Sequence, residues 1–467
     1  DVTATVTVDN LYIYRTREAS VQVEFLFGGE MVARESVDIL LRSGRNFIGI
    51  PFHIEHAHLW WPRGMGDQAL YEVRTTVTSE GDTDVAAPIE YGIRTLRLNE
   101  APMDSGRLFA FEVNGERVFC RGGDWIPADS IYSRVSDEKY TALVNAAAEA
   151  NFTMLRIWGG GIYERDIFYS LCDKAGILIW HDFMYACALY PYKDPTFVEE
   201  SRKELDYQTK RLRNHASIAV FCGSNENHWI YQQEWSQSYD PEYFGGGTIY
   251  NHLAPEIMAS NCSHIPYWNS SPYGGDVPNS TEVGNRHHWH EAMMNPEMEK
   301  RITPEFYDGV GSRFVTEYGY IGPCSMHTIE RYHGDAPIER GSDVWEWHNN
   351  TFEKETVVAG IKKHYLDPDA LSLDDYLLYA GLCQALMLGY SLEALRYTKV
   401  TNGALFWMYA DCWGEVGWTI IDYYLDRKPA YYAVKRAFAP RRLILRREGQ
   451  KLGVMLANDT ADECNIP

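Results

Sequence analysis

Two glutamates, Glu226 and Glu317, stand at the ends of short apolar segments that are typical of buried β-strands. Side chains at the C-terminal ends of neighbouring parallel strands gather at one face of a barrel, so we expect the two carboxyl groups to converge. Paired carboxyl groups can split a glycosidic bond: one protonates the leaving oxygen, and the other attacks or stabilises the anomeric carbon. The alternative is that each glutamate is a surface or salt-bridge residue. Their apolar strands and their polar and aromatic neighbours favour the catalytic interpretation.

The sequence neighbours of the two glutamates suggest different roles. Arg313 precedes Glu317 in the same strand, and alternate positions of a strand share a face. A nearby cation favours the ionised form of a carboxyl group, so we expect Glu317 to be ionised. Glu226 has amide and aromatic neighbours only, which suits the protonated form.

Further residues near the expected strand ends are typical of a sugar site. Aromatic rings pack on the apolar faces of sugar rings, and Asp or Asn side chains bind hydroxyl groups. For any single tryptophan, core packing is the alternative, but several at successive strand ends favour a sugar site. The candidates are Trp158, Trp407, Trp413, His181, Asp182 and Asn225.

Three histidines, His287, His288 and His290, could bind a metal ion. However, adjacent residues of a strand point to opposite faces. We therefore expect one histidine to face the site and its neighbour to be packed or solvated, with no metal ion. The sequence also lacks a phosphate-binding loop, a dinucleotide fingerprint and a nucleophile elbow, and we expect no cofactor.

The composition excludes several classes of function. The 467 residues include 43 basic and 65 acidic residues, a net charge of −22. Such a surface repels nucleic acids and anionic lipids, so we expect a carbohydrate partner and neither of these. No apolar run reaches the roughly 18 residues of a membrane span. The nine scattered cysteines contain no C-x-x-C and predict no disulfide framework. The compartment stays open: cytoplasmic, or secreted or periplasmic after signal removal.

The residue patterns predict a multi-domain α/β protein. Residues 1–97 alternate apolar and polar positions and predict an immunoglobulin-like β-sandwich. Residues 98–437 alternate strands with helical segments and predict a (β/α)₈ TIM barrel, with an open doubly wound sheet as the alternative. Residues 438–467 predict the beginning of a truncated C-terminal β domain. The expected barrel strands are Arg117–Arg121, Thr153–Trp158, Ile177–Asp182, Ile218–Gly223, Ile265–Asn269, Arg286–Trp289, Arg313–Glu317 and Ala404–Tyr409.

With these residues in place, the sequence resembles glycoside hydrolase family 2, and its β-mannosidase branch most of all. The resemblance covers about residues 58–437. The matching segments, in chain order, are Leu59–Pro62, Tyr91–Thr95, Arg121–Asp129, Arg156–Glu164, Trp180–Met184, Asn225–Glu226, Ser271–Asp276 and Glu317–Gly319.

The resemblance implies a retaining enzyme with Glu226 as acid/base and Glu317 as nucleophile, and with Asn225 binding the sugar hydroxyl at carbon 2. It adds Asp124, Trp125 and His288 to the substrate-binding candidates, and it implies no metal. Asp124, His181 and His288 replace residues that are more often Asn, Gln and Tyr in this branch. We expect β-mannosidase activity. The alternatives are β-galactosidase, exo-glucosaminidase or endo-β-mannosidase activity, or a non-catalytic carbohydrate-binding fragment. We also expect the N-terminal jelly-roll domain and most C-terminal domains of the family to be absent.

Overall fold

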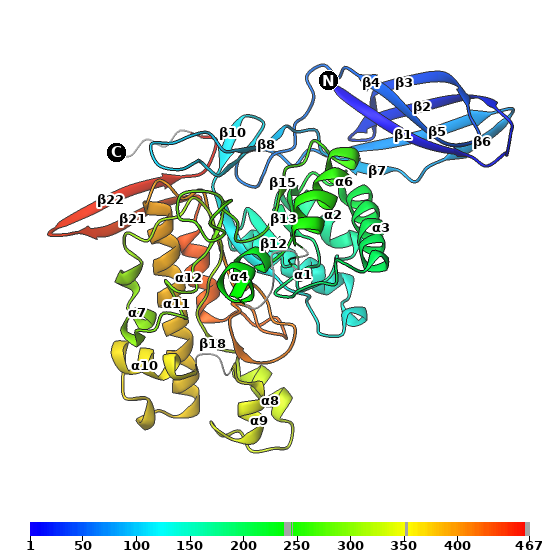
Figure 1. The fold of residues 1–467 in the computed structure, drawn as a ribbon. Coiled ribbons are helices and arrows are strands. Elements are labelled where there is room, and N and C mark those ends of the chain that lie inside the picture. Colours follow the sequence, from blue (N-terminus) through cyan, green and yellow to red (C-terminus); the bar gives the residue numbers. More distant parts are fainter. Residues whose placement is uncertain (238–243, 245, 351–353, 463–467) are drawn as a thin grey trace.

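The computed structural model describes residues 1–237, 244, 246–350 and 354–462. The N-terminal part is a β-sandwich that stands to one side of the molecule (Figure 1). One sheet pairs β1 with β4, and the other has the order β3-β2-β5-β6, with β7 also paired to β5. The strands are β1 (Val2–Asn10), β2 (Arg17–Phe27), β3 (Glu30–Leu41), β4 (Gly44–Phe52), β5 (Tyr71–Ser79), β6 (Asp82–Val85) and β7 (Ile89–Tyr91).

The sandwich forms because its strands alternate buried apolar and exposed polar residues. In β2, Val21, Val23 and Phe25 are buried, and the residues between them are more exposed. The ring of Phe25 packs edge-on against Phe52 of the other sheet, with centroids 4.8 Å apart. The two sheets thus share one apolar core.

The second part contains a curled sheet of eight strands, in which every neighbouring pair is parallel. The order is β15-β14-β13-β12-β11-β19-β17-β16, so the first strand along the chain, β11, pairs with the last, β19. The strands are β11 (Cys120–Trp125), β12 (Met154–Ile157), β13 (Leu178–Asp182), β14 (Ile218–Cys222), β15 (Tyr267–Trp268), β16 (Arg286–His287), β17 (Val315–Glu317) and β19 (Gly403–Phe406).

All eight expected strands overlap the observed ones, but the first, Arg117–Arg121, overlaps β11 only at Cys120 and Arg121. Residues 116–118 form β10 of a small antiparallel sheet with β8 (Leu96–Asn99) and β9 (Ala110–Val113), and β11 begins only at Cys120. Two glycines in β11, Gly122 and Gly123, hide it from a pattern search, because glycine is unfavourable in strands. At Gly122 a Cβ atom would lie 1.7 Å from the carbonyl oxygen of Met154, so the packing of β11 against β12 requires glycine.

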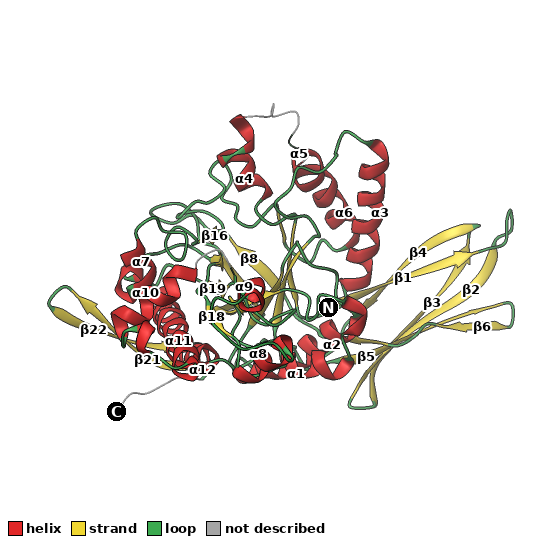
Figure 2. Cartoon of the chain, turned by 90° about the horizontal axis from the view of Figure 1, so that it is seen from below, coloured by secondary structure: helices red, strands yellow, loops and turns green. Residues whose placement is uncertain are grey.

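Helices lie around the outside of the curled sheet (Figure 2). Two apolar clusters pack against the sheet. The larger one joins sheet and helices, and the smaller one, which includes Phe109, Trp180 and Phe314, lies inside the curl. The helices are α1 (Asp137–Glu149), α2 (Asp166–Ala175), α3 (Pro195–Leu212), α4 (Asn227–Gln233), α5 (Gly246–Thr248), α6 (Ala254–Asn261), α7 (Met298–Ile302), α8 (Met326–His333), α9 (Asp343–His348), α10 (Lys354–His364), α11 (Leu373–Tyr397) and α12 (Pro429–Ala437).

The last described strands, β21 (Arg441–Glu448) and β22 (Lys451–Asn458), form an antiparallel hairpin on the side opposite the sandwich (Figure 1). A short pair, β18 (Gly322–Pro323) and β20 (Val416–Gly417), joins two loops. The eight cysteines of the described residues are free, and Cys464 lies outside them. None of the helices that the structure describes is long and apolar enough to cross a bilayer.

Candidate active site

Glu226 stands in the loop between β14 and α4, with its backbone in the left-handed region at φ 61°. This conformation is strained for a residue with a side chain and is held by neighbouring backbone. The Glu226 N–H donates to the carbonyl of Ser271 at 2.7 Å, and the Asn225 N–H donates to that of Tyr185 at 2.8 Å. The loop therefore continues the line of β14 and presents both side chains at the C-terminal end of the sheet.

Glu317 ends β17, and its carboxylate is almost fully buried. The guanidinium of Arg156, from β12, donates to its Oε2 atom at 2.9 Å, and the indole of Trp289 donates to Oε1 at 3.1 Å. The cation expected here, Arg313, is elsewhere: it donates to backbone carbonyls of Glu282 and Ser105. Four residues of strand separate Arg313 from Glu317, roughly 13 Å, which places the two at opposite ends of the sheet.

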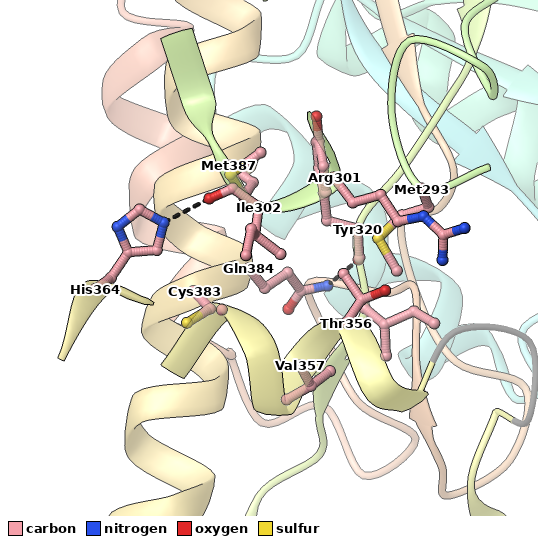
Figure 3. Close-up of a pocket in the computed structure, with 12 residues that line it drawn as sticks. Met293, Arg301, Ile302, Tyr320, Thr356, Val357, His364, Cys383, Gln384 and Met387 are labelled. Carbon is pink, nitrogen blue, oxygen red and sulfur yellow. Dashed lines mark hydrogen bonds between the residues drawn. The ribbon is translucent and has the colours of Figure 1, made fainter. Parts of the chain in front are cut away.

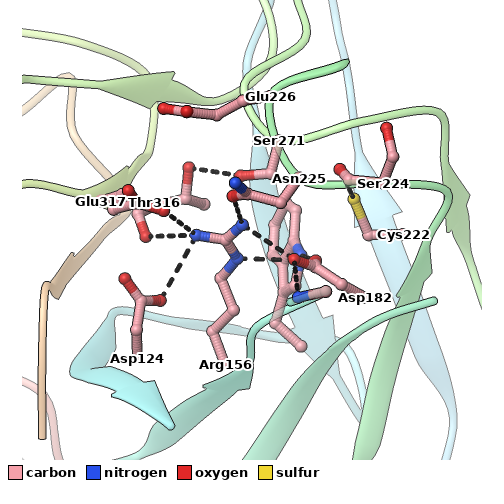
Figure 4. Close-up of polar contacts among 12 residues, drawn as sticks. Asp124, Arg156, Asp182, Cys222, Ser224, Asn225, Glu226, Ser271, Thr316 and Glu317 are labelled. Carbon is pink, nitrogen blue, oxygen red and sulfur yellow. Dashed lines mark hydrogen bonds and ion pairs between the residues drawn. The ribbon is translucent and has the colours of Figure 1, made fainter. Parts of the chain in front are cut away.

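The structure brings the two glutamates together, as Figure 4 shows. Three atoms all lie within 4.8 Å of one another: one carboxylate oxygen of Glu226, one of Glu317, and a ring nitrogen of His287. The imidazole Nδ1 atom lies 2.8 Å from Glu226 Oε1 and 3.7 Å from Glu317 Oε2. Carboxyl groups about 5–5.5 Å apart are typical of retaining glycosidases, whereas inverting enzymes have a wider separation.

The surroundings of the two carboxyl groups differ. Burial raises the pKa of Glu226 to about 7. The polar neighbours in contact with its oxygens are the His287 ring and the Cys187 thiol, which donates to Oε2 at 3.5 Å. Burial also raises the pKa of Glu317, but the charge and hydrogen bond of Arg156 oppose that rise. The site therefore favours a proton on Glu226 and a negative charge on Glu317.

Of the two adjacent histidines, His287, which ends β16, faces the carboxyl groups, and His288, which directly follows the strand, does not. His288 points to the opposite side of the strand, where its ring binds the hydroxyls of Tyr307 at 3.1 Å and Ser312 at 2.7 Å. The expectation of one site-facing histidine agrees with this arrangement, but the choice of His288 as the substrate-binding one does not. Successive strand residues alternate sides, and the sequence alone leaves the register undetermined by one residue.

Two other candidates, His181 and Trp125, also point away from the carboxyl groups. His181 belongs to β13, and its ring faces α2, where the Tyr169 hydroxyl is bonded to its Nε2 atom at 2.9 Å. Trp125 packs between Tyr140 and Phe168, and its indole donates to Glu164 at 2.9 Å. Both side chains belong to the core between the sheet and the helices.

Asp124, Asp182 and Asn225 gather around Arg156 in the interior of the curl (Figure 4). The guanidinium lies 2.8 Å from Asp182 Oδ2 and 3.5 Å from Asp124 Oδ1, and it donates to Asn225 Oδ1 at 2.6 Å. Burial holds the pKa of Asp124 well above its usual range. Its Oδ2 atom is buried without a hydrogen-bond partner among the described residues, which leaves it free to bind a hydroxyl group. Arg156 was not among the site residues predicted from sequence, because nothing in the chain order shows that it joins four strands.

The tryptophan candidates separate into two groups. Trp158 and Trp407, which follow β12 and β19, pack edge-to-face with centroids 5.1 Å apart, and both are half-buried. They stand directly after the C-terminal ends of these two strands. Trp413 lies farther along the loop after β19, where its ring stacks on His348 at 4.6 Å.

Glu226, His287 and Glu317 could each offer one atom to a metal ion. However, Arg156 already contributes a fixed positive charge 2.9 Å from Glu317, and a cation bound next to it would be repelled. Glu317 is bonded to a cation and Glu226 is not, and this arrangement suits acid/base and nucleophilic chemistry better than metal binding.

Two hollows lie near these elements. One, of about 530 Å³, is lined by residues such as Trp229, Asn279 and His290 and lies beside His287, whose backbone is bonded to the Asn279 side chain. The other lies under α10 and α11, between Met293, Val357 and Met387 (Figure 3), and its volume of about 20 Å³ has room for about one water molecule. None of the predicted site residues lines the second cavity.

Comparisons with known proteins find relatives that are named β-mannosidase. The chain is 34% identical over 412 residues to "Beta-mannosidase B" of Emericella nidulans, covering 85% of this chain and 48% of that protein. The crystal structure of a β-D-mannosidase from Dictyoglomus thermophilum superposes with a TM-score of 0.90 at 36% identity, covering 98% of this chain and 55% of that one. No protein-family model matches the chain.

An exo-chitosanase of Amycolatopsis orientalis shares the fold, with a TM-score of 0.73 at 19% identity over 94% of this chain and 51% of that one. The chain spans about half the length of the relatives it matches. Over that half, the comparisons confirm the resemblance to the β-mannosidase branch of glycoside hydrolase family 2.

Proposed function

We propose that this chain carries the catalytic site of a retaining glycoside hydrolase that releases terminal β-linked sugars, and specifically that it acts as a β-mannosidase. The observation that carries the proposal is the pair of carboxyl groups, Glu226 and Glu317, whose oxygens lie within 4.8 Å across the C-terminal end of the curled sheet. The relatives named β-mannosidase support the choice of sugar.

The proposed reaction is a double displacement. An oxygen of ionised Glu317 bonds to the anomeric carbon while the bond to the leaving oxygen breaks, and that oxygen takes the proton of Glu226. Glu226, now ionised, then takes a proton from a water molecule, whose oxygen bonds to the anomeric carbon and releases Glu317. Arg156 holds the Oε2 atom of Glu317 and Trp289 holds its Oε1 atom, and the raised pKa of Glu226 gives it a proton near neutral pH.

We assign the sugar-binding groups from their positions around the pair. Asn225, oriented by Arg156, offers its amide to a hydroxyl next to the reacting carbon, and the buried Oδ2 atom of Asp124 offers a second contact. Trp158 and Trp407 offer aromatic surface to the ring. The hollow beside Trp229 accommodates the leaving group, because α4 begins directly after Glu226.

The proposal includes the finer architecture. The curled sheet would be a (β/α)₈ barrel within residues 98–437, preceded by an immunoglobulin-like sandwich and followed by the start of a C-terminal β domain. Closure is supported by Asn285, before β16, whose side chain bonds to Ser270 and Ser271, after β15. These bonds cross the seam between the two edge strands.

A panel of aryl β-glycosides tests the proposed activity. We expect turnover of the β-mannoside in preference to the β-galactoside, β-glucoside and β-glucosaminide, with a β-configured first product. Preference for another glycoside would retain the mechanism and change the sugar. An absence of turnover with every glycoside, combined with sugar binding by calorimetry, would instead support a non-catalytic carbohydrate-binding role.

A further inference from the structure

We propose that a buried polar triangle, formed by Ser271, Asn285 and Thr316, fixes the proton of His287 on its Nε2 atom and thereby keeps Glu226 protonated in the resting site. The inference rests on the proposed acid/base role of Glu226 and extends it to residues that touch neither carboxyl group of the pair. It concerns positioning residues, because the triangle acts only through His287.

The orientation of Asn285 is the first step. Its Nδ2 atom donates to the carbonyl of Ser270 at 3.2 Å, which fixes which end of the amide is oxygen. The Oδ1 atom then lies 2.9 Å from the hydroxyl of Ser271 and 2.8 Å from that of Thr316. Asn285 is completely buried, and an amide oxygen can only accept hydrogen bonds, so both hydroxyls are drawn to donate to it.

A count of protons then decides the state of His287. Four contacts each need one proton. Three join the Ser271 hydroxyl to Asn285 at 2.9 Å, to Thr316 at 2.8 Å and to the Nε2 atom of His287 at 3.1 Å. The fourth joins the Thr316 hydroxyl to Asn285. The two hydroxyls supply two protons. If Nε2 is protonated, the ring supplies a third, and three contacts are satisfied. If Nε2 carries no proton, only two contacts can be satisfied. A hydrogen bond to Nε2 then requires Ser271 to turn its proton away from Asn285.

The opposite ring nitrogen carries the consequence to Glu226. Burial lowers the pKa of His287 to about 3, so the ring is neutral and has one proton only. With that proton on Nε2, Nδ1 presents a lone pair to Glu226 Oε1 at 2.8 Å. A protonated carboxyl group donates to this lone pair, whereas an ionised one faces it without a proton. The network therefore favours the acid form of Glu226.

Other charged and titratable groups also face His287 and Glu226, and their charges are the same in every variant compared. They are Glu317 on β17, Arg156 on β12, Asp182 on β13, Cys187 in the following loop and Glu234 after α4. The variants below leave all of them in place.

The direct test is nitrogen-15 NMR of the histidine rings in the intact protein, with the His287 signals assigned by their loss in His287→Gln. A protonated and a bare ring nitrogen have well-separated shifts, so the spectrum reports the tautomer without any turnover. We expect the proton on Nε2 and the bare nitrogen at Nδ1. A spectrum with the proton on Nδ1, or with a doubly protonated ring at pH 7, would overturn the proposal.

Three variants separate the triangle from general packing. Asn285→Leu removes the obligatory acceptor at similar volume, so Ser271 can donate to Nε2; we expect a mixture of tautomers or Nδ1–H. Asn285→Asp keeps an acceptor oxygen, and Thr316→Val removes a hydroxyl while Ser271 still donates to Asn285. Both should keep the Nε2–H signature. An unchanged tautomer in Asn285→Leu would contradict the role of the triangle.

The same variants have a kinetic readout. With Nδ1–H donating to Glu226, the ionised carboxylate is stabilised, and the alkaline limb of kcat/KM on a poor leaving group should move to lower pH by about one unit. Asn285→Asp should restore the limb toward its original position. If Asn285→Leu changes the tautomer but not the limb, His287 does not control Glu226 and the proposal fails. If the unaltered protein shows Nε2–H yet turns over no glycoside, the proposed function fails instead.

Discussion

Arg156 and Glu317 form a buried ion pair inside the curled sheet, with 2.9 Å between the guanidinium nitrogen and the carboxylate oxygen. The oxygens of Glu226 contact a neutral imidazole and a thiol, and one of them lies within 4.8 Å of a Glu317 oxygen. Burial raises the pKa of both side chains, but only Glu317 has a hydrogen-bonded cation that opposes the rise. This asymmetry is the basis for proposing Glu226 as the acid/base and Glu317 as the nucleophile.

Glu317→Ala should abolish glycoside turnover, by about 10³-fold or more, because no group remains to form the covalent intermediate. Added azide should occupy the vacated space, attack the anomeric carbon directly and give an inverted glycosyl azide. Proton NMR of the product establishes its configuration. A retained product would show that Glu317 is not the nucleophile.

Glu226→Ala should affect substrates according to their leaving groups. Turnover of glycosides with poor leaving groups should fall by roughly 10²–10⁴-fold, since they need a proton, while dinitrophenyl glycosides should still form the intermediate. Azide should then accelerate the second step and give a retained glycosyl azide. If this variant instead behaves like Glu317→Ala, the two roles are exchanged.

The value of kcat/KM should fall as the pH rises above about 7, because the first step needs protonated Glu226 and the pKa of this group is about 7. The fall should be steep for an alkyl or unsubstituted phenyl glycoside and shallow for a dinitrophenyl glycoside, which needs no acid. A limb of equal steepness for both substrates would assign the titration to another group.

Stability should respond to the same carboxyl group. The folded pKa of Glu226 is about 7 against an ordinary value of 4.5, so the folded protein holds this proton more tightly than the unfolded chain. The contribution of this proton to the free energy of unfolding is fully present below about pH 4.5 and is lost as the pH rises to 7 and beyond. Glu226→Gln, which cannot ionise, should therefore be more stable than the unaltered protein at pH 8, by up to about 3 kcal/mol, and similar to it at pH 4.5. Denaturant unfolding at the two pH values measures the difference, and an equal effect at both would refute it.

The convergence of Glu226 and Glu317 could be predicted from sequence because it depends on features that the chain order displays. Glu226 and Glu317 each follow an apolar strand, and parallel strands bring their ends together whatever the register.

The parts that could not be predicted depend on which face a side chain takes or which distant strand it meets. His288 was chosen over His287, and a one-residue difference in register reverses the two. Arg313 was expected to pair with Glu317 because it is near in sequence, whereas Arg156 pairs with it from a strand on the other side of the curl. Burial of an arginine among several carboxylates becomes evident only when the strands are assembled.

Trapping the covalent intermediate tests the central claim most directly. The protein would be treated with a 2-deoxy-2-fluoro-β-mannosyl fluoride, which forms the glycosyl-enzyme quickly and releases it slowly, and then digested and examined by mass spectrometry. We predict one stoichiometric sugar adduct on the peptide that contains Glu317, at the carboxylate that Arg156 holds, and no adduct in Glu317→Gln. A sugar adduct on Glu226 or on any other residue, or catalysis of the β-mannoside with inversion, would contradict the account.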